Sequence, residues 1–220
     1  MINTKAYKNL LQECTTRNVT LVAVSKTKPI EDILELYDLG HRDFGENYVQ
    51  ELIEKEKQLP KDIRWHFIGH LQTNKVKQVV EFVHLIHGVD SLKLLKEINK
   101  QSEKLNKVTQ CLLQVHIAQE ETKFGLDENE VKEIIDQITT KPFSNANITG
   151  LMGMASFTDN TDQARKEFKY LKSLQTKYNN QTLDVKLETL SMGMTADYTI
   201  AIEEGSNMIR VGSLIFGTRN

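Results

Sequence analysis

The sequence contains only two cysteines, Cys14 and Cys111, and they lie far apart in the chain. This scarcity excludes a CxxC redox motif and a cysteine-based zinc site, and it allows one disulfide at most. A reducing cytoplasm is therefore the simplest setting. Cys111 begins an apolar run, and we expect it to be a small, buried hydrophobic residue.

Neither sign of charge dominates the sequence. Lys and Arg number 28 against 30 Asp and Glu, which gives a formal net charge of -2. No strong field therefore points to nucleic acid or to an anionic membrane, and small metabolites are favoured as partners. Long hydrophobic runs are also missing, so neither a signal peptide nor a membrane span is indicated. We expect a soluble, cytoplasmic protein.

Proline is scarce as well, with three residues that all lie at the boundaries of predicted elements. No linker, low-complexity tract or block of like charge divides the chain. A length of 220 residues fits one large domain. We therefore expect a single domain over residues 1–220.

Short apolar or β-branched runs alternate with helical patterns along the chain, as in repeated βα units that build a parallel sheet. The eight candidate strands are residues 21–25, 42–46, 65–69, 84–89, 111–117, 148–154, 187–193 and 208–213. Eight strands in one undivided chain predict an α/β fold, a (β/α)8 TIM barrel. An open, doubly wound sheet is the alternative, because the second and third candidates are weak.

Apolar residues at helical spacing mark amphipathic helices between the strands, and an extra helix over about residues 4–16 would precede the first strand. The clearest stripes are Ile30, Ile33, Leu34 and Tyr37 before Gly40; Val131, Ile134, Ile135 and Ile138 after a capping box of Asp127 and Glu130; Ala164, Phe168 and Leu171; and Tyr198 with Ile202.

Lys26 ends the first predicted strand, and Asn47 follows the second. Taken alone, Lys26 and the nearby Lys28 fit an ordinary solvated turn, because an ammonium group is costly to remove from water. In a barrel, however, the residues that follow the strands form the functional face. The barrel prediction therefore makes Lys26 and Asn47 candidate site residues.

Small residues gather at the ends of the last two predicted strands, in "LSMGMTAD" and "RVGSLIFG". Barrels commonly hold a phosphate at the loops after strands seven and eight, so Ser191, Gly193, Gly212 and Ser213 are candidate phosphate residues. The alternative is that these glycines only serve turns. A lysine opposite a phosphate site has the geometry to hold a phosphorylated aldehyde as a Schiff base, which indicates pyridoxal 5'-phosphate.

Six consecutive blocks carry a resemblance to a known family along nearly the whole chain. The blocks are "VAVSKTKP", "DFGENYVQE", "WHFIGHLQTNK", "KFGL", "GLMGMASF" and "LSMGMTADYTIAIEEGSNMIRVGSLIFG". In this order they resemble the pyridoxal phosphate homeostasis proteins, a family similar to the N-terminal domain of alanine racemase. The resemblance implies a (β/α)8 barrel of the alanine racemase type that holds pyridoxal 5'-phosphate.

The resemblance also implies roles for single residues. It implies that the cofactor is linked to Lys26 and that Arg210 faces the pyridine nitrogen. The further cofactor contacts that it implies are Asn47 near the ring and Ser191, Gly212 and Ser213 at the phosphate. Many family members carry threonine at the position of Ser213, and serine keeps the hydroxyl.

An arginine at the ring nitrogen predicts weak catalysis. Arg210 stays charged and cannot accept a proton, so it would leave that nitrogen unprotonated and the ring a poor electron sink. The alternative is that Arg210 only caps the last predicted strand or pairs with Glu203 or Glu204.

The histidines are weaker candidates. His66 and His70 stand four residues apart, but the segment between them fits a strand that leaves into a loop, so we expect no metal site. His84, His87 and His116 lie in apolar runs, and we expect them to be hydrogen-bonded core residues. In the resembling family "HLQTNK" lies on the cofactor side, where Asn74 or Lys75 would act in exchange with a partner.

Three functions fit a lysine-bound cofactor: a binding protein, an amino-acid racemase-like enzyme and a Schiff-base aldolase. Aldolases typically place the lysine on a late strand, unlike Lys26. Alanine racemases add a second domain that supplies a catalytic tyrosine, and this sequence ends at Asn220, seven residues past Ser213. We therefore expect a monomeric protein of pyridoxal phosphate homeostasis that stores, protects or delivers the cofactor to apo-enzymes, without robust turnover.

Overall fold

Eight parallel strands form a closed barrel in the computed structural model, which describes residues 2–120, 124–181 and 185–218. The strands are β1 (Thr20–Val24), β2 (Asp43–Glu46), β3 (Arg64–Phe67), β4 (Leu85–Val89), β5 (Thr109–Val115), β6 (Ala146–Gly153), β7 (Thr189–Ser191) and β8 (Met208–Val211). Each strand pairs with the next in the sequence, and β8 pairs with β1. This last pairing excludes the open sheet, so the predicted (β/α)8 barrel is confirmed.

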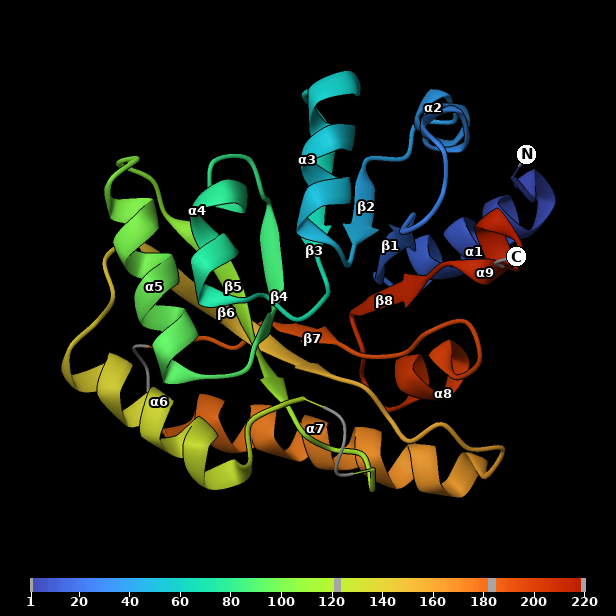
Figure 1. Cartoon of the computed structure of the whole chain (residues 1–220). Coiled ribbons are helices and arrows are strands. Elements are labelled where there is room, and N and C mark those ends of the chain that lie inside the picture. Colours follow the sequence, from blue (N-terminus) through green and yellow to red (C-terminus); the bar gives the residue numbers. More distant parts are fainter. Residues whose placement is uncertain (1, 121–123, 182–184, 219–220) are drawn as a thin grey trace.

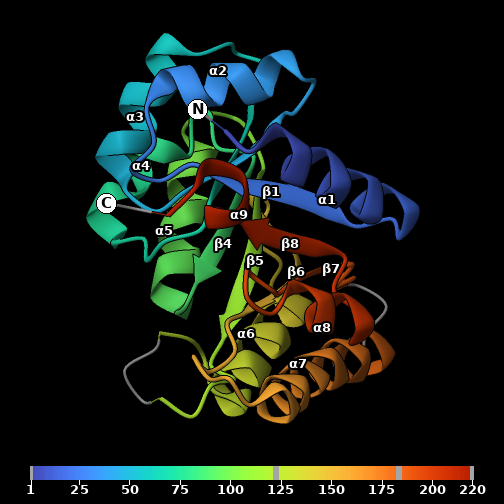
Figure 2. The ribbon, with the colours of Figure 1, turned by 90° about the vertical axis from the view of Figure 1, so that its right-hand side faces the viewer.

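Helices surround the barrel on its outside (Figures 1 and 2). They are α1 (Thr4–Thr16), α2 (Ile30–Asp38), α3 (Val49–Gln58), the 3-10 turn η1 (Thr73–Lys75), α4 (Val76–Val79), α5 (Leu92–Glu103), α6 (Glu128–Thr140), α7 (Thr161–Gln181), α8 (Tyr198–Glu203) and α9 (Ser213–Phe216). The predicted extra helix is α1, which packs against β1 and α9. The backbone N–H of Asn3 donates to the carbonyl of Ile215 at 2.7 Å, and this bond joins the two ends of the chain.

Local signals account for several helix boundaries. The capping box of Asp127 and Glu130 is present at the start of α6, as predicted. Pro29 precedes the first residue of α2, where a fixed φ suits the entry into a helix. The helix α3 has no clear apolar stripe in the sequence, because it buries a lysine, Lys55, on its inner side.

The side chains of each strand alternate between two cores. The larger core lies between strands and helices and includes Leu21 and Ala23 of β1. The smaller core consists of strand residues that point into the barrel, namely Val22, Leu85, Leu112, Met152 and Met208. Burial of such a side chain stabilises the fold by roughly 1.5–3 kcal/mol. The alternation also means that the residues in line with Val22 along β1 point to the barrel interior.

Two sequence expectations need correction or completion. His84 was expected in a strand as a core residue, but β4 begins one residue later and His84 is exposed. Cys111 is fully buried as expected, and burial raises the pKa of its thiol to about 12.

Across residues 2–120, 124–181 and 185–218, every helix is too short or too polar to cross a membrane.

His41 is a buried titratable residue at the start of β2. Its Nε2 lies 2.9 Å from the carbonyl oxygen of Asp43, and its ring makes edge contacts with Tyr7 and Phe44. Burial lowers the pKa of His41 to about 4. Between pH 6.5 and pH 4 the unfolded chain therefore binds a proton that the folded chain does not, and acid favours unfolding.

We expect His41 to make the free energy of unfolding fall by about 1.4 kcal/mol per pH unit as the pH drops from 6.5 towards 4. Urea unfolding at several pH values would measure this slope for the wild type and for His41→Gln, which cannot titrate. The variant should have a slope smaller by about this amount. Equal slopes would show that His41 is protonated in the folded state.

Candidate functional site: a cavity at the carboxyl ends of the strands

Lys26 extends the inward-facing row of β1. Val24 and Lys26 both line a cavity of about 860 Å³, and Lys28 lies at the same cavity. The Lys28 ammonium is bound by the carbonyls of Phe216 at 2.9 Å and Thr218 at 3.3 Å. Of the two lysines, Lys26 thus continues the barrel interior while Lys28 ties down the C-terminal segment, so a plain solvated turn does not describe Lys26.

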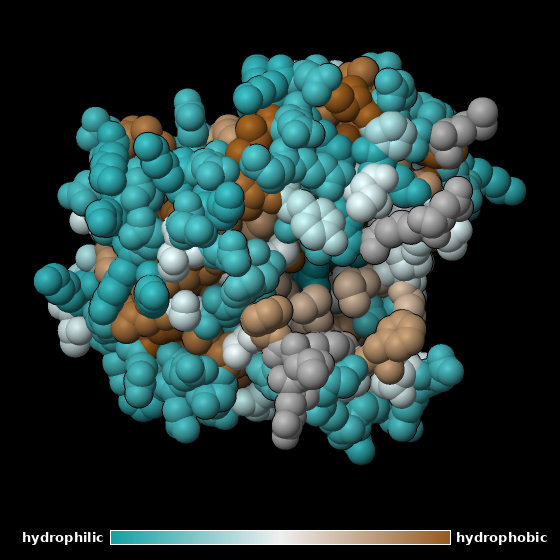
Figure 3. Space-filling model, in the orientation of Figure 1, coloured by the Kyte–Doolittle hydropathy of each residue, from teal (hydrophilic) through white to brown (hydrophobic). Residues whose placement is uncertain are grey.

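Five of the six predicted site residues line this one cavity. They are Lys26, Asn47, Arg210, Gly212 and Ser213. They come from the ends of β1, β2 and β8, which lie side by side in the closed barrel. The face in Figure 3 is hollowed near its centre, with hydrophilic and hydrophobic residues around the hollow.

The loops after β6 and β7 supply the rest of the wall, and the sequence reasoning did not single them out. Their cavity residues include Ala155, Ser156 and Phe157 after β6 and Met194 and Thr195 after β7. The signal that could have found them is their place directly after a strand, within the quoted blocks "GLMGMASF" and "LSMGMTAD".

Asn47 contributes a polar atom that has no protein partner. Its Oδ1 is buried, and no hydrogen bond to it is present among the described residues. Buried acceptors are nearly always bonded, so an unpaired one at a cavity wall is a feature that a ligand can satisfy.

Gly212 and Ser213 offer close approach to the backbone and a hydroxyl. A Cβ added at Gly212 would lie 3.1 Å from the carbonyl oxygen of Val24, so a larger residue would crowd β1. Ser213 is exposed at the rim. Gly193 lies outside the cavity wall, and its φ of +95° and the close approach of Ala201 account for that glycine.

Arg210 is buried and held by three hydrogen bonds. Its Nη1 donates to the carbonyl of Ser191 at 2.8 Å and to Ser191 Oγ at 2.7 Å, and its Nη2 donates to the carbonyl of Gly153 at 3.1 Å. Burial lowers the pKa of Arg210 to about 10, which leaves the guanidinium charged at neutral pH. The alternative pairing with Glu203 or Glu204 is wrong, because Arg165 binds both carboxylates.

A chain of hydrogen bonds continues from Arg210 through the barrel. We call Asp43, His66, His87, Ser191 and Arg210 the interior chain. Ser191 Oγ lies 3.0 Å from His87 Nδ1, His87 Nε2 lies 3.0 Å from His66 Nδ1, and His66 Nε2 lies 3.0 Å from Asp43 Oδ1. Each bond can run in the same direction, with the Arg210 end donating and the Asp43 carboxylate accepting last.

The surroundings of the interior chain set the protonation states of His87 and Asp43. Burial lowers the pKa of His87 well below its usual value, so His87 is neutral at physiological pH. The His66 and Arg64 side chains bound to Asp43 lower the pKa of that carboxyl against the opposing effect of burial. His87 is therefore a hydrogen-bonded core residue, as expected, and His116 is half-buried beside the carbonyl of Glu120.

The structure does not place Ser191 with the other predicted phosphate residues. Ser191 is fully buried, lies outside the cavity wall, and has its hydroxyl engaged by His87 and Arg210. Its geometry supports a role behind Arg210 in place of a direct phosphate contact.

His66 and His70 have separate surroundings. His66 lies inside the barrel, whereas His70 is at the surface and bonded to Asp90 at 2.8 Å. Within the described residues no group of three or more histidine, cysteine or carboxylate side chains could hold a metal. Asn74 borders a separate shallow pocket with His70 and Asp90.

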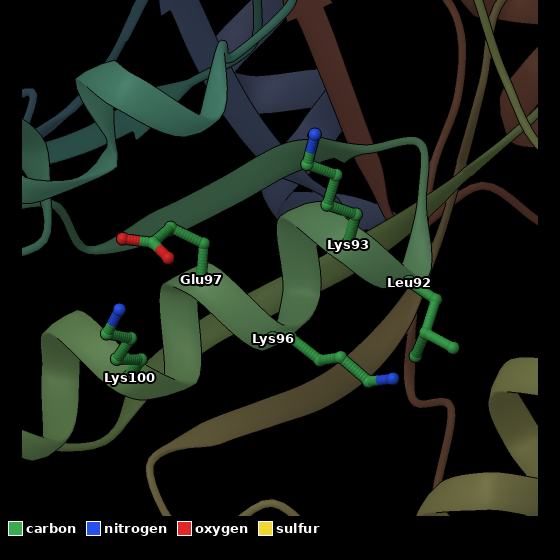
Figure 4. Close-up of a pocket in the computed structure, with 5 residues that line it drawn as sticks. All are labelled: Leu92, Lys93, Lys96, Glu97 and Lys100. Carbon is green, nitrogen blue, oxygen red and sulfur yellow. The ribbon is translucent and has the colours of Figure 1, made fainter.

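A second surface hollow lies on α5, away from the strand ends. Figure 4 shows it with Lys93, Lys96, Lys100, Glu97 and Leu92, and Lys96 points away from Lys93 and Lys100. None of the predicted site residues borders it. Splayed lysines around one glutamate on an exposed helix fit a solvated face.

We expect Ser191→Ala to lower the free energy of unfolding by about 1–3 kcal/mol, because it leaves the buried His87 Nδ1 without a donor. Urea unfolding would measure the change. Ser213→Ala, at the exposed rim, is the matched control and should change stability by less than about 0.5 kcal/mol. Equal effects of the two substitutions would contradict the buried role of Ser191.

Comparisons with known proteins place the chain in a family. The sequence matches the family described as "Alanine racemase, N-terminal domain" over residues 3–220. The pyridoxal phosphate homeostasis protein of Pasteurella multocida (strain Pm70) is 40% identical over 207 residues, covering 92% of this chain and 87% of that protein. The protein of the same name from Homo sapiens is 38% identical over 211 residues, covering 91% and 76%.

Solved structures show similarity to the same group of proteins. PipY of Synechococcus elongatus PCC7942 with PLP bound has a TM-score of 0.84 and 34% identity, covering 91% of this chain and 93% of that chain. Alanine racemase from Bartonella henselae has a TM-score of 0.68 and 16% identity, which shows a shared fold alone, over 97% of this chain and 59% of that chain. The chain thus belongs to the pyridoxal phosphate homeostasis protein family, whose barrel is the alanine racemase N-terminal domain.

Proposed function

We propose that this protein binds pyridoxal 5'-phosphate as a Schiff base on Lys26 and acts in intracellular homeostasis of that cofactor. The observation that carries the proposal is the meeting of Lys26, Asn47, Arg210, Gly212 and Ser213 in one cavity. Relatives that carry the name pyridoxal phosphate homeostasis protein, and PipY with PLP bound, support it.

The cavity residues fit the chemical groups of this cofactor. When bound, the cofactor supplies an aldehyde that condenses with a primary amine and a ring that can accept electrons. Lys26 supplies the amine, Asn47 offers its unpaired Oδ1 near the ring, and Gly212 and Ser213 offer backbone and a hydroxyl for the phosphate.

Arg210 would face the ring nitrogen as a donor. Its Nη atoms are fixed by Ser191 and Gly153, and a charged guanidinium donates hydrogen bonds but accepts none. The ring nitrogen would therefore stay an acceptor without a proton of its own. This arrangement favours holding the cofactor over driving a reaction on it.

The composition of the wall supports a binding protein over an enzyme. A racemase needs a second acid or base on the opposite face of its substrate. Among the described residues, the titratable side chains of the wall besides Lys26 and Arg210 are Lys28, Asp159 and Asp197, without tyrosine, histidine or cysteine. The Lys28 ammonium is bound by carbonyls, and Asp159 is exposed. A racemase-like enzyme remains the alternative function.

The remaining proposals concern the oligomeric state, the location and the partners of the protein. We propose that residues 1–220 act as one monomeric unit in the cytoplasm and that apo-enzymes dependent on pyridoxal phosphate receive the cofactor. Cys14 and Cys111 are both free and buried, which suits a reducing compartment.

We expect the protein loaded with pyridoxal phosphate to show a visible absorption band that depends on Lys26. Borohydride reduction and peptide mapping should place the label on Lys26. Lys26→Ala should lose the band and bind the cofactor at least about a hundredfold more weakly, as for a loss of about 3 kcal/mol. Lys28→Ala is the control and should keep the band. A label mainly on Lys28 or Lys75 would contradict the assignment.

We expect the loaded protein to transfer pyridoxal phosphate to apo-enzymes without converting amino acids at an enzymic rate. In the presence of a scavenger for free cofactor, loaded protein should activate apo-enzymes faster than an equal amount of free pyridoxal phosphate does. Incubation with L-alanine should produce no D-alanine at an enzymic rate, because the described part of the wall offers no tyrosine, histidine or cysteine as a second acid or base besides Lys26. Rapid racemisation that Lys26→Ala abolishes would favour the enzyme.

A further inference from the structure

The backbone that carries Lys26 is held in an unusual turn. The N–H of Lys28 donates to the carbonyl of Ser25 at 3.0 Å, which places Lys26 and Thr27 at the two central positions. Thr27 has a φ of +62°, in the left-handed region. Turns with this geometry at their third residue favour glycine or asparagine, and a β-branched residue there is strained. Such strain persists only where the surroundings enforce it.

Two side chains of α3 grip the backbone on either side of Lys26. Glu51 Oε1 accepts the N–H of Thr27 at 2.6 Å, and Lys55 Nζ donates to the carbonyl of Ser25 at 2.8 Å. The two side chains also pair with each other at 2.7 Å, one helical turn apart. The grip therefore acts on the peptide groups that set the direction of the Lys26 side chain.

A third charged residue, Glu46 at the end of β2, joins these two side chains to the barrel. Glu46 Oε1 accepts from Lys55 Nζ and from Ser25 Oγ, at 2.8 and 2.6 Å. Glu46 is fully buried and Lys55 nearly so. Since Lys55 also binds Ser25 and Glu51, all three of its N–H donors have acceptors.

A buried charged cluster is not needed for packing at this position. Replacing buried ion pairs with well-packed hydrophobic residues is often neutral or stabilising in proteins. A cluster that binds both peptide groups of Lys26, next to the strained Thr27, has a more specific use. None of Glu46, Glu51 and Lys55 lines the cavity, so their effect on a ligand is indirect, and their contacts with Ser25 and Thr27 lead to Lys26.

We propose that Glu46, Glu51 and Lys55 form a clamp that holds Thr27 in the left-handed conformation and thereby directs Lys26 into the cavity. The clamp residues are positioning residues for attachment of the cofactor. This inference rests on the proposed function only for the identity of the molecule that Lys26 binds.

The first test measures the effect of the clamp on the backbone at Thr27 and needs no cofactor. Glu51→Ala removes the acceptor of the Thr27 N–H while Lys55 keeps Glu46, and Glu51 is partly exposed, so the barrel should fold. Amide hydrogen exchange at Thr27 should become at least about tenfold faster, whereas exchange in β1 and β8 should not change. Glu54→Ala, at an exposed position of the same helix, is the matched control and should leave Thr27 unchanged.

The second test uses a rescue. Glu51→Ala should slow the appearance of the visible band on addition of pyridoxal phosphate by about tenfold, which corresponds to about 1.4 kcal/mol. Thr27→Gly in the same chain should restore most of the rate, because glycine adopts the left-handed conformation without a clamp. A side chain that only packed α3 against the barrel would not be rescued in this way.

Each outcome separates the two proposals. Unchanged exchange at Thr27 in Glu51→Ala, or failure of Thr27→Gly to restore attachment, would overturn the clamp. Wild-type protein that takes up no cofactor on Lys26 would overturn the proposed function, while the exchange experiment would still decide on the clamp. Lys55→Met provides a second variant with the same expected loss and tests the grip on Ser25.

Discussion

The pairing of β1 with β8 is the interaction on which the site depends. It aligns Thr20 with Met208 and Ala23 with Val211, so the first and last strands of the barrel end side by side. Lys26 and Gly212 therefore line the same cavity, and a Cβ added at Gly212 would lie 3.1 Å from the carbonyl oxygen of Val24, close enough to crowd β1. Without closure the lysine and the residues after β8 would lie at opposite edges of a sheet.

Inside this frame, separate sets of polar groups hold Arg210 and the backbone around Lys26. The interior chain runs from Asp43 through His66, His87 and Ser191 to Arg210. The clamp of Glu46, Glu51 and Lys55 binds Ser25 and the backbone of Thr27, on either side of Lys26. Buried polar groups cost stability when they are left unbonded, and these two sets of groups end at Arg210, which lines the cavity, and at the peptide groups that flank Lys26.

The proposed function requires a site that can hold a cofactor of broad chemistry without driving a reaction on it. Lys26 can bind an aldehyde covalently, and Arg210 can donate to a ring nitrogen without giving it a proton. The described wall offers a second lysine engaged by carbonyls and an exposed aspartate as its other ionisable groups, with Asp197 near α8. These features fit the attachment of a cofactor that the proposed function requires.

The sequence by itself indicated eight candidate strands along the chain, the helix over residues 4–16, the capping box before α6 and Lys26 as a candidate site residue, because periodicity, caps and strand ends are local features. Only the tertiary structure decided that the strands close into a barrel, because the pairing of β8 with β1 joins residues far apart in the sequence. The sequence could not determine that Ser191 faces the interior beside His87, because a shift of one residue changes the face of a strand. It also could not show that β4 begins only after His84, which leaves that histidine exposed. Only the tertiary structure brought Glu46, Glu51 and Lys55 to the turn around Lys26, since their contacts join β1, β2 and α3. The left-handed backbone of Thr27 and the contacts of the buried Lys55 ammonium depend on neighbours from other elements, so a local sequence pattern cannot predict them.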